Sequence, residues 1–595
     1  MFPNLYSKMN KLIDSLKAIY LRHPFMVVFF ISIILTLPWI TMGDFYYKGE
    51  PREASVATYI MNTGNWILPA GYADETAYKP PFMHWLIVLF SLPFGSVNIA
   101  TARLPSALSL IGITLMTFVF LRKRKSVFVA CMAALFVLTS FEMHRWALES
   151  RVDMILAFLM IGALFSMFTW EEKGLKGYPL LIPLFLGGAA LVKGPVGILL
   201  PCLVFGIYLI ILQRYSLWRI ILKNILVALP AAFILSLWYI LAYRQGGTHF
   251  FNLVYAENVG RFLSKSNESL GISYNLGHIE PFWYYIPSII AGFVPWSFLL
   301  IISAFAVKYS NPFRQFSLKA FLQKLATMDK VTLFSILSTS IIVMFYMIPA
   351  SKRTVYIMPI YPFTAYLLVM LYDWAVTEKP RLIKGLGYFI LVLSGLMLVL
   401  EGIFRFVSLS NLMRPLFHDL KTLHDIQAFS QAFQHPSPVA VIVWFILLAA
   451  ILTFTVVLKK RSTYSILFGM MALFICLQVF LEGSVYPEFK DSYSSRPFAE
   501  KIQATYDLKG HTYVINDLIT YPNLYGLNFY TGNHFLNFEK KMPSCGYFIT
   551  GSTMIENIRK KYAGSYIFDE LERSPDRFND FNDIMVIYKI TKVGK

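Results

Sequence analysis

The segment KGEPREASVATYIMNTGNWILPAGYADETAYKPPFMHWL, residues 48–86, follows directly after the first apolar stretch of the chain. It is polar, is interrupted by glycine and proline, and carries Glu50, Arg52, Glu53 and Lys79. The chain around it is very different, since 56% of the 595 residues are hydrophobic and only 15% are charged. That composition is typical of a membrane protein with several spans rather than of a soluble enzyme. The segment is therefore interpreted as a polar loop between membrane helices.

Apolar stretches long enough to cross a bilayer recur along the chain. A transmembrane helix needs about 20 mostly apolar residues, and the stretches 25–42, 284–307 and 331–348 are examples. Because lipid offers no hydrogen-bonding partner to a backbone amide, these stretches are expected to be α-helices. The net charge of +19 does not indicate a nucleic-acid partner, since the basic residues are spread over short loops between the spans.

The basic loops predict the orientation of the spans, because cytoplasmic loops are enriched in lysine and arginine. The segments assigned to the cytoplasm are the N-terminus, 122–125, 173–176, 214–219, 308–330, 379–384 and 459–461. This pattern predicts thirteen transmembrane helices, provided that the short segment 84–98 lies at the interface or re-enters instead of crossing. The loops 43–100 and 243–283, and everything after about residue 484, then face outward.

The residues after 484 form a charged sequence without a membrane-length apolar run. SSRPFAEKIQATY (494–506) and TMIENIRKKYAG (553–564) predict helices. HTYVIND (511–517), GYFIT (546–550) and DIMVIYKI (583–590) predict strands. The chain is thus divided into a polytopic α-helical transmembrane domain, residues 1–483, and a small extracytoplasmic α/β domain, residues 484–595.

Charged residues at the predicted outer ends of the spans gather on one face of the membrane. Each costs about 2.5–3.5 kcal/mol at the centre of a membrane helix, so such residues mark candidate functional sites. They are Glu50, Arg52, Glu53 and Lys79 in the first loop, Glu149, Arg151 and Asp153 in the 142–153 segment, Lys193, Glu257, Arg261, His278, Lys352 and Arg353. Their convergence predicts an outward-facing polar cavity at the bilayer surface.

The mixture of many cations with a few carboxylates indicates a particular chemistry. Lysine and arginine together bind phosphate, and at a membrane surface the phosphate most economically belongs to a lipid. A carboxylate beside it could remove a proton from a hydroxyl acceptor. Structural explanations stay open: Glu53 as a helix-dipole residue, Asp153 as a helix N-cap, Lys79 as an interfacial cation and His278 as an interfacial hydrogen-bonding residue.

Several motifs resemble those of a known family. The order GEPREA, MNTGNWILP, YKPPFMHW and ARLPSAL is similar to the first outer loop of the ArnT-like and protein O-mannosyltransferase-like membrane glycosyltransferases. RVDM, LVKGPVG, ENVGRF, HIEPFWYYIP, GFVPW and SKRTVYIMPIYP follow in the family's order, over about residues 25–365. The resemblance implies the GT-C fold with about thirteen spans and a C-terminal outer domain. It also implies transfer of a sugar from a polyprenyl-phosphate carrier to a lipid or protein hydroxyl on the outer face.

The resemblance also suggests roles for individual residues. Lys79 and Arg261 are expected to hold the donor phosphate, with Glu50 as the catalytic carboxylate and Asp153 as its rival. Direct displacement with inversion at the anomeric carbon is expected, because no further carboxylate is obviously placed as a nucleophile. The other residues expected to bind substrate are Arg52, Arg103, Arg151, Glu257, His278, Lys352, Arg353 and Tyr356.

Three positions depart from the family pattern. The acidic motif usually reads Asp-Glu, whereas this chain reads Gly49-Glu50, so the catalytic-base role moves to Glu50 or fails. The aminoarabinose transferases of the family carry Glu and His at the positions of Tyr78 and Asn258. The pair that would bind a divalent metal in that family is therefore replaced, so no cofactor is predicted and dependence on a divalent metal stays open. The same departures bear on lipid A aminoarabinose transfer in particular.

The sequence thus predicts a glycosyltransferase of the bacterial inner membrane, with a cytoplasmic N-terminus and a periplasmic C-terminal domain. Its partners would be a polyprenyl-phosphate sugar, membrane lipids and a lipid A-like or other glycolipid acceptor, with no nucleic acid. A protein O-glycosyltransferase is the alternative within the enzyme class. The rivals outside it are a non-catalytic carrier binder and a transporter of lipid-linked sugars. Transporters often show internal repeats and place their binding sites near the membrane midplane. This sequence shows no such repeats, and its charged residues gather at the ends of the spans.

Overall fold

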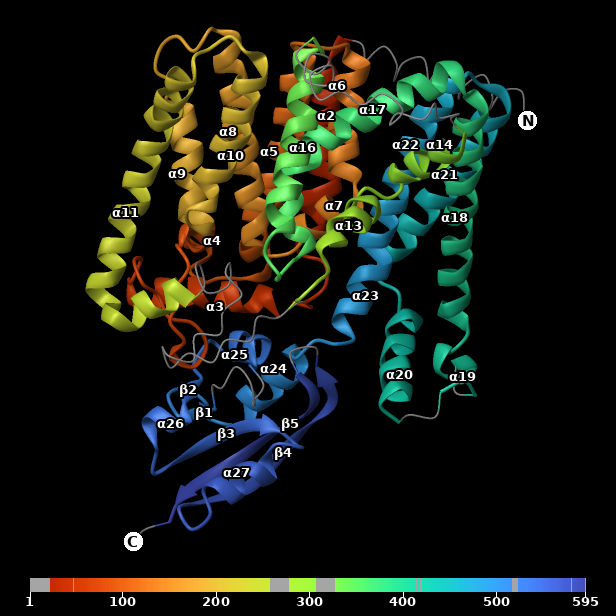
Figure 1. Ribbon diagram of the computed structural model, residues 1–595. Helices are drawn as coiled ribbons and strands as arrows, with labels where there is room; N and C mark the ends of the chain where they lie inside the picture. The colour runs from red at the N-terminus through yellow and green to blue at the C-terminus, as the bar shows by residue number, and fades with distance from the viewer. Residues whose placement is uncertain are drawn as a thin grey trace.

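A computed structural model of the protein describes residues 22–593, apart from 47, 257–277, 307–326, 414, 418–419, 516–522 and 579–580. The described residues form a bundle of long helices with a small β-sheet at one end (Figure 1). The last strand, β5 (Phe581–Lys592), ends on the side of the sheet away from the bundle (Figure 1).

By length and composition, eight helical segments of the described part of the chain could cross a membrane, or ten if two bent helix pairs are also counted. The eight are α5 (Ile99–Arg122), α8 (Val152–Glu172), α11 (Leu217–Tyr255), α16 (Lys330–Met347), η7 with α17 (Thr354–Ile360 and Tyr361–Glu378), α18 (Pro380–Phe406), α21 (Pro438–Lys460), and α22 with η8 and α23 (Thr463–Phe480, Leu481–Val485 and Tyr486–Asp491). The protein is therefore a multi-pass α-helical membrane protein, as its composition predicts.

Shorter apolar helices accompany these spans. They are α2 (Pro24–Thr36) with its terminal turn η1 (Leu37–Trp39), α4 (Phe82–Ser91) with η3 (Leu92–Phe94), α9 (Leu181–Lys193) and α10 (Val196–Leu212). Each contains fewer residues than the length usually needed to span a bilayer. The number of thirteen spans accordingly stays a prediction.

Two helix pairs are bent. α6 (Val127–Thr139) meets α7 (Phe141–Ala147) at 59°, and η6 with α13 (Phe282–Tyr284 and Tyr285–Gly292) meets α14 (Ser297–Ala306) at 112°. The second break divides the stretch 284–307, for which the apolar pattern predicts one span. It falls around Pro295, which has no backbone N–H to continue the helix. Hydrophobicity alone does not reveal this bend.

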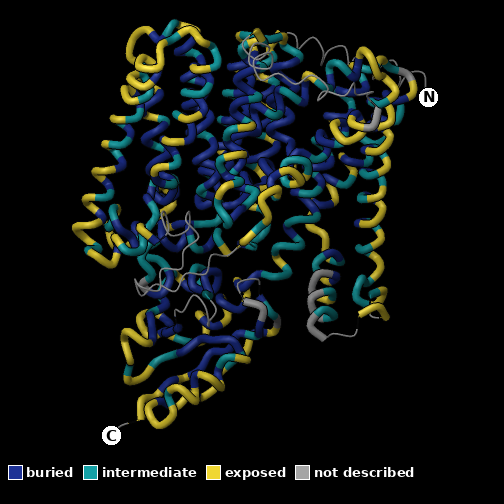
Figure 2. The backbone as a smooth tube through the Cα atoms, in the orientation of Figure 1, coloured by how far each residue is buried: buried dark blue, intermediate teal, exposed yellow. Residues whose placement is uncertain are grey.

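The helices differ in how much of their surface the protein covers. In the most apolar part of α8, 78% of the residues are buried, whereas the corresponding values are 28% for α11 and 33% for α18. Figure 2 shows the same contrast, with buried residues concentrated in the middle of the bundle and exposed ones along α11 and α18. We infer that α8 is central and that α11 and α18 face lipid.

The first polar loop folds at the end of the bundle that faces the sheet. α3 (Gly49–Thr63) lies across that end (Figure 1), and Gly64, with a φ of 71°, ends the helix in the left-handed conformation that glycine adopts most readily. The loop continues through the turn η2 (Tyr72–Asp74), α4 (Phe82–Ser91) and the turn η3 (Leu92–Phe94). The ten residues of α4 rise about 15 Å, about half of the hydrocarbon thickness, which agrees with a segment that does not cross.

The C-terminal residues form a five-stranded sheet in the order β2-β1-β3-β5-β4. β1 pairs in parallel with β2 and β3, and β5 pairs antiparallel with β3 and β4. The strands are β1 (Thr512–Val514), β2 (Leu536–Asn537), β3 (Cys545–Gly551), β4 (Tyr566–Phe578) and β5 (Phe581–Lys592), and the helices are α24 (Arg496–Thr505), α25 (Tyr525–Tyr530), α26 (Phe538–Lys541) and α27 (Ile555–Lys561). Two further helices, α19 (Leu409–Met413) and α20 (Leu420–Gln434), lie at the same end of the bundle (Figure 1).

Both faces of the sheet are covered, because side chains alternate along each strand. On β5, Met585 and Ile587 belong to one hydrophobic cluster, whereas Val586, Tyr588 and Ile590 belong to another. The first cluster is covered by α24 and the second by α27. The two helices and three strands predicted in this region are all present, and the last two residues of the segment predicted for β1, 516 and 517, lie outside the described residues.

The prediction missed the edge strand β4. Its sequence YIFDELERSPDRF carries five acidic or basic residues before its last arginine and also a proline, a composition that a central strand does not tolerate. An edge strand tolerates both, since one side of it has no partner strand and charge there discourages aggregation. The charged residues and the proline that suit an edge position therefore prevented a strand from being predicted for β4.

Candidate active site

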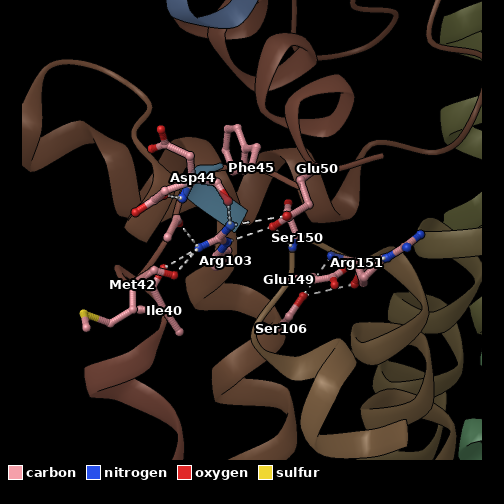
Figure 3. A network of polar contacts seen from close by, with 12 residues as sticks. Ile40, Met42, Asp44, Phe45, Glu50, Arg103, Ser106, Glu149, Ser150 and Arg151 are labelled. Carbon is pink, nitrogen blue, oxygen red and sulfur yellow. Dashed lines mark hydrogen bonds and ion pairs between the residues drawn. The ribbon is translucent and has the colours of Figure 1, made fainter. Parts of the chain in front are cut away.

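Arg103, near the start of α5, is completely buried and lies at the centre of a polar network (Figure 3). Its Nε donates to Glu50 Oε1 at 2.8 Å, and its Nη2 donates to Glu50 Oε2 at 3.3 Å. Its Nη1 and Nη2 also donate to four carbonyl oxygens of the segment 40–44, at 2.9–3.4 Å. Arg103 thus fastens the chain after α2 to the start of α3.

Glu50, expected as the catalytic carboxylate, is also completely buried. Its Oε1 accepts a further hydrogen bond from the Ser150 N–H at 3.1 Å. Burial opposes ionisation, but the charge and hydrogen bonds of Arg103 hold the pKa of Glu50 below its usual value. The opposite holds for Glu149, whose pKa is raised by burial and by the charge of Glu50. Glu50 therefore lies inside a closed network and not, as expected, on the surface of a cavity.

A small pocket of about 40 Å³ lies between α3, the segment 71–79 and α4. It is lined by both cations of the first loop that were expected to bind substrate, Arg52 and Lys79, and both lie at half-buried positions. The polar side chains of its lining are Arg52, Glu53, Tyr72, Glu75, Thr76, Tyr78, Lys79 and His84. The pocket thus combines phosphate-binding side chains with titratable groups that can exchange a proton.

Glu53 is the most firmly held carboxylate of this pocket. Its Oε1 lies 2.9 Å from Arg52 Nη2, and its Oε2 lies 2.7 Å from His84 Nε2. Burial would raise the pKa of Glu53, but Arg52, His84 and Lys79 together hold it well below its usual value. Glu53 in turn raises the pKa of the Arg52 guanidinium. The carboxylate is therefore ionised, which a residue that serves only the dipole of α3 does not require.

Asp153, the second expected carboxylate, lies in the first turn of α8 and is buried. It forms an ion pair with Lys193, the last residue of α9. Lys193 Nζ also lies 4.1 Å from the centroid of the Tyr356 ring. Lys79 exerts an electrostatic effect on both Asp153 and Glu53. The pocket of the first loop and the Asp153 pair are thus electrostatically connected through Lys79.

Arg151 belongs to the interior network rather than to the lining of the pocket. Its guanidinium carbon lies 4.0 Å from the centroid of the Trp146 ring, and its Nε lies 3.5 Å from Glu149 Oε2. The backbone N–H of Arg151 donates to Ser106 Oγ at 3.0 Å. Together with Arg103, this residue supports the site without lining the pocket.

The later expected residues form a separate group. Lys352 is only 3% exposed, and its Nζ donates to the carbonyl oxygen of Glu280 at 2.9 Å. Arg353 Nη2 lies 2.6 Å from His278 Nε2. These contacts join the residues after 277 to the start of η7. Glu257 and Arg261, also expected to bind substrate, lie outside the described residues, as does Asn258.

The C-terminal domain contacts the pocket directly. Tyr72 of η2 lines the pocket and is completely buried in the hydrophobic cluster that covers one face of the sheet. Tyr525 of α25 donates its hydroxyl hydrogen to Glu75 Oε2 at 2.9 Å, and the side-chain amide of Asn533 donates to the carbonyl oxygen of Ser55 at 3.2 Å. The segment that carries Lys79 is therefore held from outside by the tail.

Sequence reasoning did not identify His84 as a site residue. It stands within the apolar run PFMHWLIVLF, so the pattern offers only one weak signal, a lone titratable residue in an apolar helix. The contribution of Tyr525 could not be anticipated, because it comes from a segment 450 residues away from Glu75. In the described part of the chain, no group of three or more His, Cys, Asp or Glu side chains is arranged to hold a metal ion.

Comparison with known proteins gives the context of this site. Residues 78–240 match the model of the dolichyl-phosphate-mannose-protein mannosyltransferase family. A curated undecaprenyl phosphate-alpha-4-amino-4-deoxy-L-arabinose arabinosyl transferase from Shewanella sediminis is 26% identical over 46% of this chain and 48% of its own length. A relative from Proteus mirabilis with the same described activity is 26% identical over 42% of this chain and 44% of its own. The chain spans about half the length of the curated relatives it matches.

The solved structures extend this likeness over nearly the whole chain. ArnT from Cupriavidus metallidurans, bound to undecaprenyl phosphate, superimposes with a TM-score of 0.65 over 95% of this chain and 96% of its own, at 18% identity. The chain has the fold of ArnT. The resemblance that the first outer loop indicates is thereby confirmed, and with it the GT-C architecture carrying a small C-terminal sheet domain.

The structure shows which side chains stand at the positions that depart from the family pattern. Gly49 is the first residue of α3 and has no side chain to act as an acid or base. Tyr78 lines the pocket with a phenol where the family carries a carboxylate. Of the two positions at which the resemblance suggests metal ligands, Tyr78 offers a phenol and Asn258 lies outside the described residues, so the acid–base chemistry of this pocket depends on other side chains.

Proposed function

We propose that the protein is an integral membrane glycosyltransferase. It moves a sugar from a polyprenyl-phosphate donor to a hydroxyl group of a lipid A-like or other glycolipid acceptor. One observation carries the proposal: Arg52 and Lys79 share a pocket with an ionised carboxylate, Glu53, in a fold of the ArnT type. The relatives named as arabinosyl transferases of undecaprenyl phosphate sugars support the class of donor.

Lys79 is proposed as the principal ligand of the donor phosphate. An ammonium group acts as a compact point charge for phosphate, and a guanidinium adds a planar fork. Lys79 follows Tyr78 and precedes two prolines, so its backbone has little freedom. Arg52 lies in the same pocket, although one side of its guanidinium already contacts Glu53. Arg261 stays a proposed second ligand.

The transfer is proposed to be a direct displacement with inversion at the anomeric carbon. A polyprenyl phosphate is a competent leaving group, and the cations that bind it stabilise the negative charge as the glycosidic bond breaks. Glu50 is fully enclosed by hydrogen-bond donors, so we assign it a positioning role together with Arg103. Asp153 is paired with Lys193 and stays one candidate for the proton acceptor.

The protein is proposed to lie in the bacterial inner membrane, with the outer loops 43–100 and 243–283 and the domain 484–595 in the periplasm. Contacts among the loops assigned to the cytoplasm support their placement on one side of the membrane, and their basic residues support the cytoplasmic side. Arg124 pairs with Glu172, Lys125 Nζ lies 2.8 Å from Asp329 Oδ2, and Lys330 Nζ lies 2.9 Å from Glu171 Oε2. These contacts bring three separate loops to one end of the bundle.

A protein acceptor is the alternative to a lipid. The matching family model is described by protein mannosylation, whereas the relatives of similar fold and sequence are described by aminoarabinose transfer. In this proposal, the C-terminal domain and the loops beside the pocket determine whether a lipid or a protein is the acceptor. An assay that offers both kinds of acceptor to the same protein distinguishes them.

The proposal is tested by sugar transfer in liposomes that contain the purified protein. A panel of labelled polyprenyl-phosphate sugars is supplied with extracted envelope lipids or envelope proteins as acceptors. Wild type is compared with Lys79→Ala and with Lys560→Ala, a matched control at an exposed position of α27. Product from one donor, lost in Lys79→Ala and unchanged in the control, supports the proposal.

Two other outcomes would lead to different functions. Movement of a labelled donor across the bilayer without a new glycosidic bond would indicate a transporter. Donor binding that depends on Lys79, with no turnover for any donor, would indicate a carrier-binding protein. In either case the proposed activity would be rejected.

A further inference from the structure

His84 has a specific arrangement at the start of α4. Its side chain is 3% exposed, it lines the same pocket as Lys79, and its Nε2 lies 2.7 Å from Glu53 Oε2. The other carboxylate oxygen of Glu53 lies 2.9 Å from Arg52 Nη2. The carboxylate is therefore fixed at both oxygens, and the imidazole ring is fixed by the carboxylate.

This contact determines which nitrogen of His84 is available for chemistry. An ionised carboxylate only accepts hydrogen bonds, so a neutral imidazole facing Glu53 must carry its hydrogen on Nε2. Its Nδ1 then presents a lone pair. Among the described residues, Nδ1 has no hydrogen-bond partner and is buried. A buried, unpaired acceptor is unfavourable, and a hydroxyl group entering the pocket would relieve that cost.

The carboxylates suggested by the sequence are less available. Both oxygens of Glu50 accept hydrogen bonds inside a closed network. Asp153 is ion-paired with Lys193. The position that carries aspartate in the resembling family is Gly49 here. Among the side chains that line the pocket with Lys79, Glu75 accepts a hydrogen bond from Tyr525, whereas His84 Nδ1 has no partner among the described residues and is available to an acceptor hydroxyl.

We propose that His84, oriented by Glu53, is the catalytic base that removes the proton from the acceptor hydroxyl. The inference rests on the proposed glycosyltransferase function. In the step, the acceptor oxygen forms a bond to the anomeric carbon and its proton passes to His84 Nδ1. The bond from the anomeric carbon to the phosphate oxygen breaks, and its electron pair leaves with the polyprenyl phosphate beside Lys79. Glu53 stabilises the imidazolium until it returns its proton to water.

The charged surroundings suit this role. The groups that face the pair are the cations Arg52 and Lys79, the carboxylate of Glu75, and the phenols of Tyr78 and Tyr525. The two cations keep Glu53 ionised, and Glu53 favours the protonated form of the imidazole that arises during the step. A base must be unprotonated before it can accept a proton, so transfer should slow towards acid pH.

A second histidine–glutamate pair serves as the internal control. His144 Nε2 lies 3.3 Å from Glu482 Oε1, and both side chains are buried. Neither residue lines the pocket of the first loop. The His144→Gln substitution therefore perturbs a buried imidazole of similar exposure without touching the proposed reaction.

The test measures transfer rates at saturating donor from pH 5 to pH 9, with the binding of polyprenyl phosphate measured in parallel. The variants are His84→Gln, His84→Ala, Glu53→Gln, Asp153→Asn and His144→Gln. We expect His84→Gln to lower the rate at pH 7.5 by about 100-fold or more, to remove the fall in rate at acid pH, and to change donor affinity less than threefold. Added imidazole should restore part of the activity of His84→Ala, and His144→Gln should behave as wild type.

Each contrary result has a definite meaning. A His84→Gln rate within threefold of wild type, or an acid limb that persists in it, overturns the proposal. Loss of turnover confined to Asp153→Asn assigns the base to Asp153 instead. Should both His84 variants fail to fold, Glu53→Gln still decides: a rate and pH profile equal to wild type overturn the proposal. Absence of transfer by wild type with every donor rejects the proposed function itself.

Discussion

The buried pair of Glu50 and Arg103 allows a quantitative test of the claim that Glu50 supports the site without acting as its base. Both side chains are completely buried, and Arg103 also holds four backbone carbonyl groups of the segment 40–44. Removing one member of a buried ion pair leaves an uncompensated charge and costs about 3–5 kcal/mol. We therefore expect Arg103→Met to destabilise the protein by about that amount.

Glu50→Gln should lower the free energy of unfolding by less than Arg103→Met does. Arg103 keeps its carbonyl acceptors, and the amide oxygen of glutamine can still accept a hydrogen bond from the Ser150 N–H. The double variant should be more stable than the sum of the single effects predicts, with a coupling energy of about 1–3 kcal/mol. The free energy of unfolding would be measured by titration with sodium dodecyl sulfate in mixed micelles, followed by tryptophan fluorescence. Transfer rates would be measured on the folded fraction of each variant.

The pH dependence of the free energy of unfolding follows from the direction in which folding shifts the pKa of Glu50. The pKa of Glu50 is lowered in the folded protein, so its stabilising effect is complete above the usual glutamate value of about 4.3. The effect is lost as the pH falls through the lower pKa of the folded state. A Glu50→Gln variant of unchanged stability that has lost all turnover would refute the positioning role and restore Glu50 as the base.

Three further predictions concern the C-terminal domain and its contact with the pocket. Tyr525→Phe removes the hydrogen bond to the Glu75 carboxylate and should weaken the docking of the segment 71–79 by about 1.5–3 kcal/mol; faster hydrogen exchange in that segment checks this, and unchanged exchange contradicts it. Tyr72→Ala opens a cavity in the cluster that covers the sheet and should cost about 3–5 kcal/mol, seen as a lower midpoint of thermal unfolding of the tail. Burial opposes ionisation of Asp583, but hydrogen bonds from Thr553 and Ser552 lower its pKa. The stabilising effect of the Asp583 carboxylate should be present above the usual aspartate pKa of about 3.9 and be lost as the pH falls through the lower pKa of the folded state. Asp583→Asn should therefore flatten the acid dependence of exchange in β5, and a variant that keeps the wild-type dependence would contradict the prediction.

Much of the fold could be predicted because its signals are local. Continuous apolar stretches predict membrane helices, and short runs of aromatic and β-branched residues in GYFIT and DIMVIYKI predict β3 and β5. Basic loops indicated that 84–98 does not cross, in agreement with the short α4. By contrast, the break at Pro295 and the edge strand β4 depend on the positions of neighbouring segments, which a local pattern does not contain.

The site was predicted only in part for the same reason. Composition and topology brought Arg52 and Lys79 to one face, and they line one pocket. Whether a carboxylate faces substrate or the protein interior depends on its partner, and the partner of Glu50 lies 53 positions along the chain. His84 gave almost no signal, since its significance comes from a contact with Glu53 that forms only when α4 packs against α3.

The most direct test of the central claim follows the oxygen atom that links the sugar to phosphorus in the donor. The donor that supports transfer would be synthesised with ¹⁸O at this bridging position, and both products would be analysed by mass spectrometry and by the anomeric configuration of the transferred sugar. The account predicts that the label stays in the released polyprenyl phosphate, that the configuration is inverted, and that both products disappear in Lys79→Ala. Label found in the glycosylated acceptor, or a sugar of retained configuration, would contradict it.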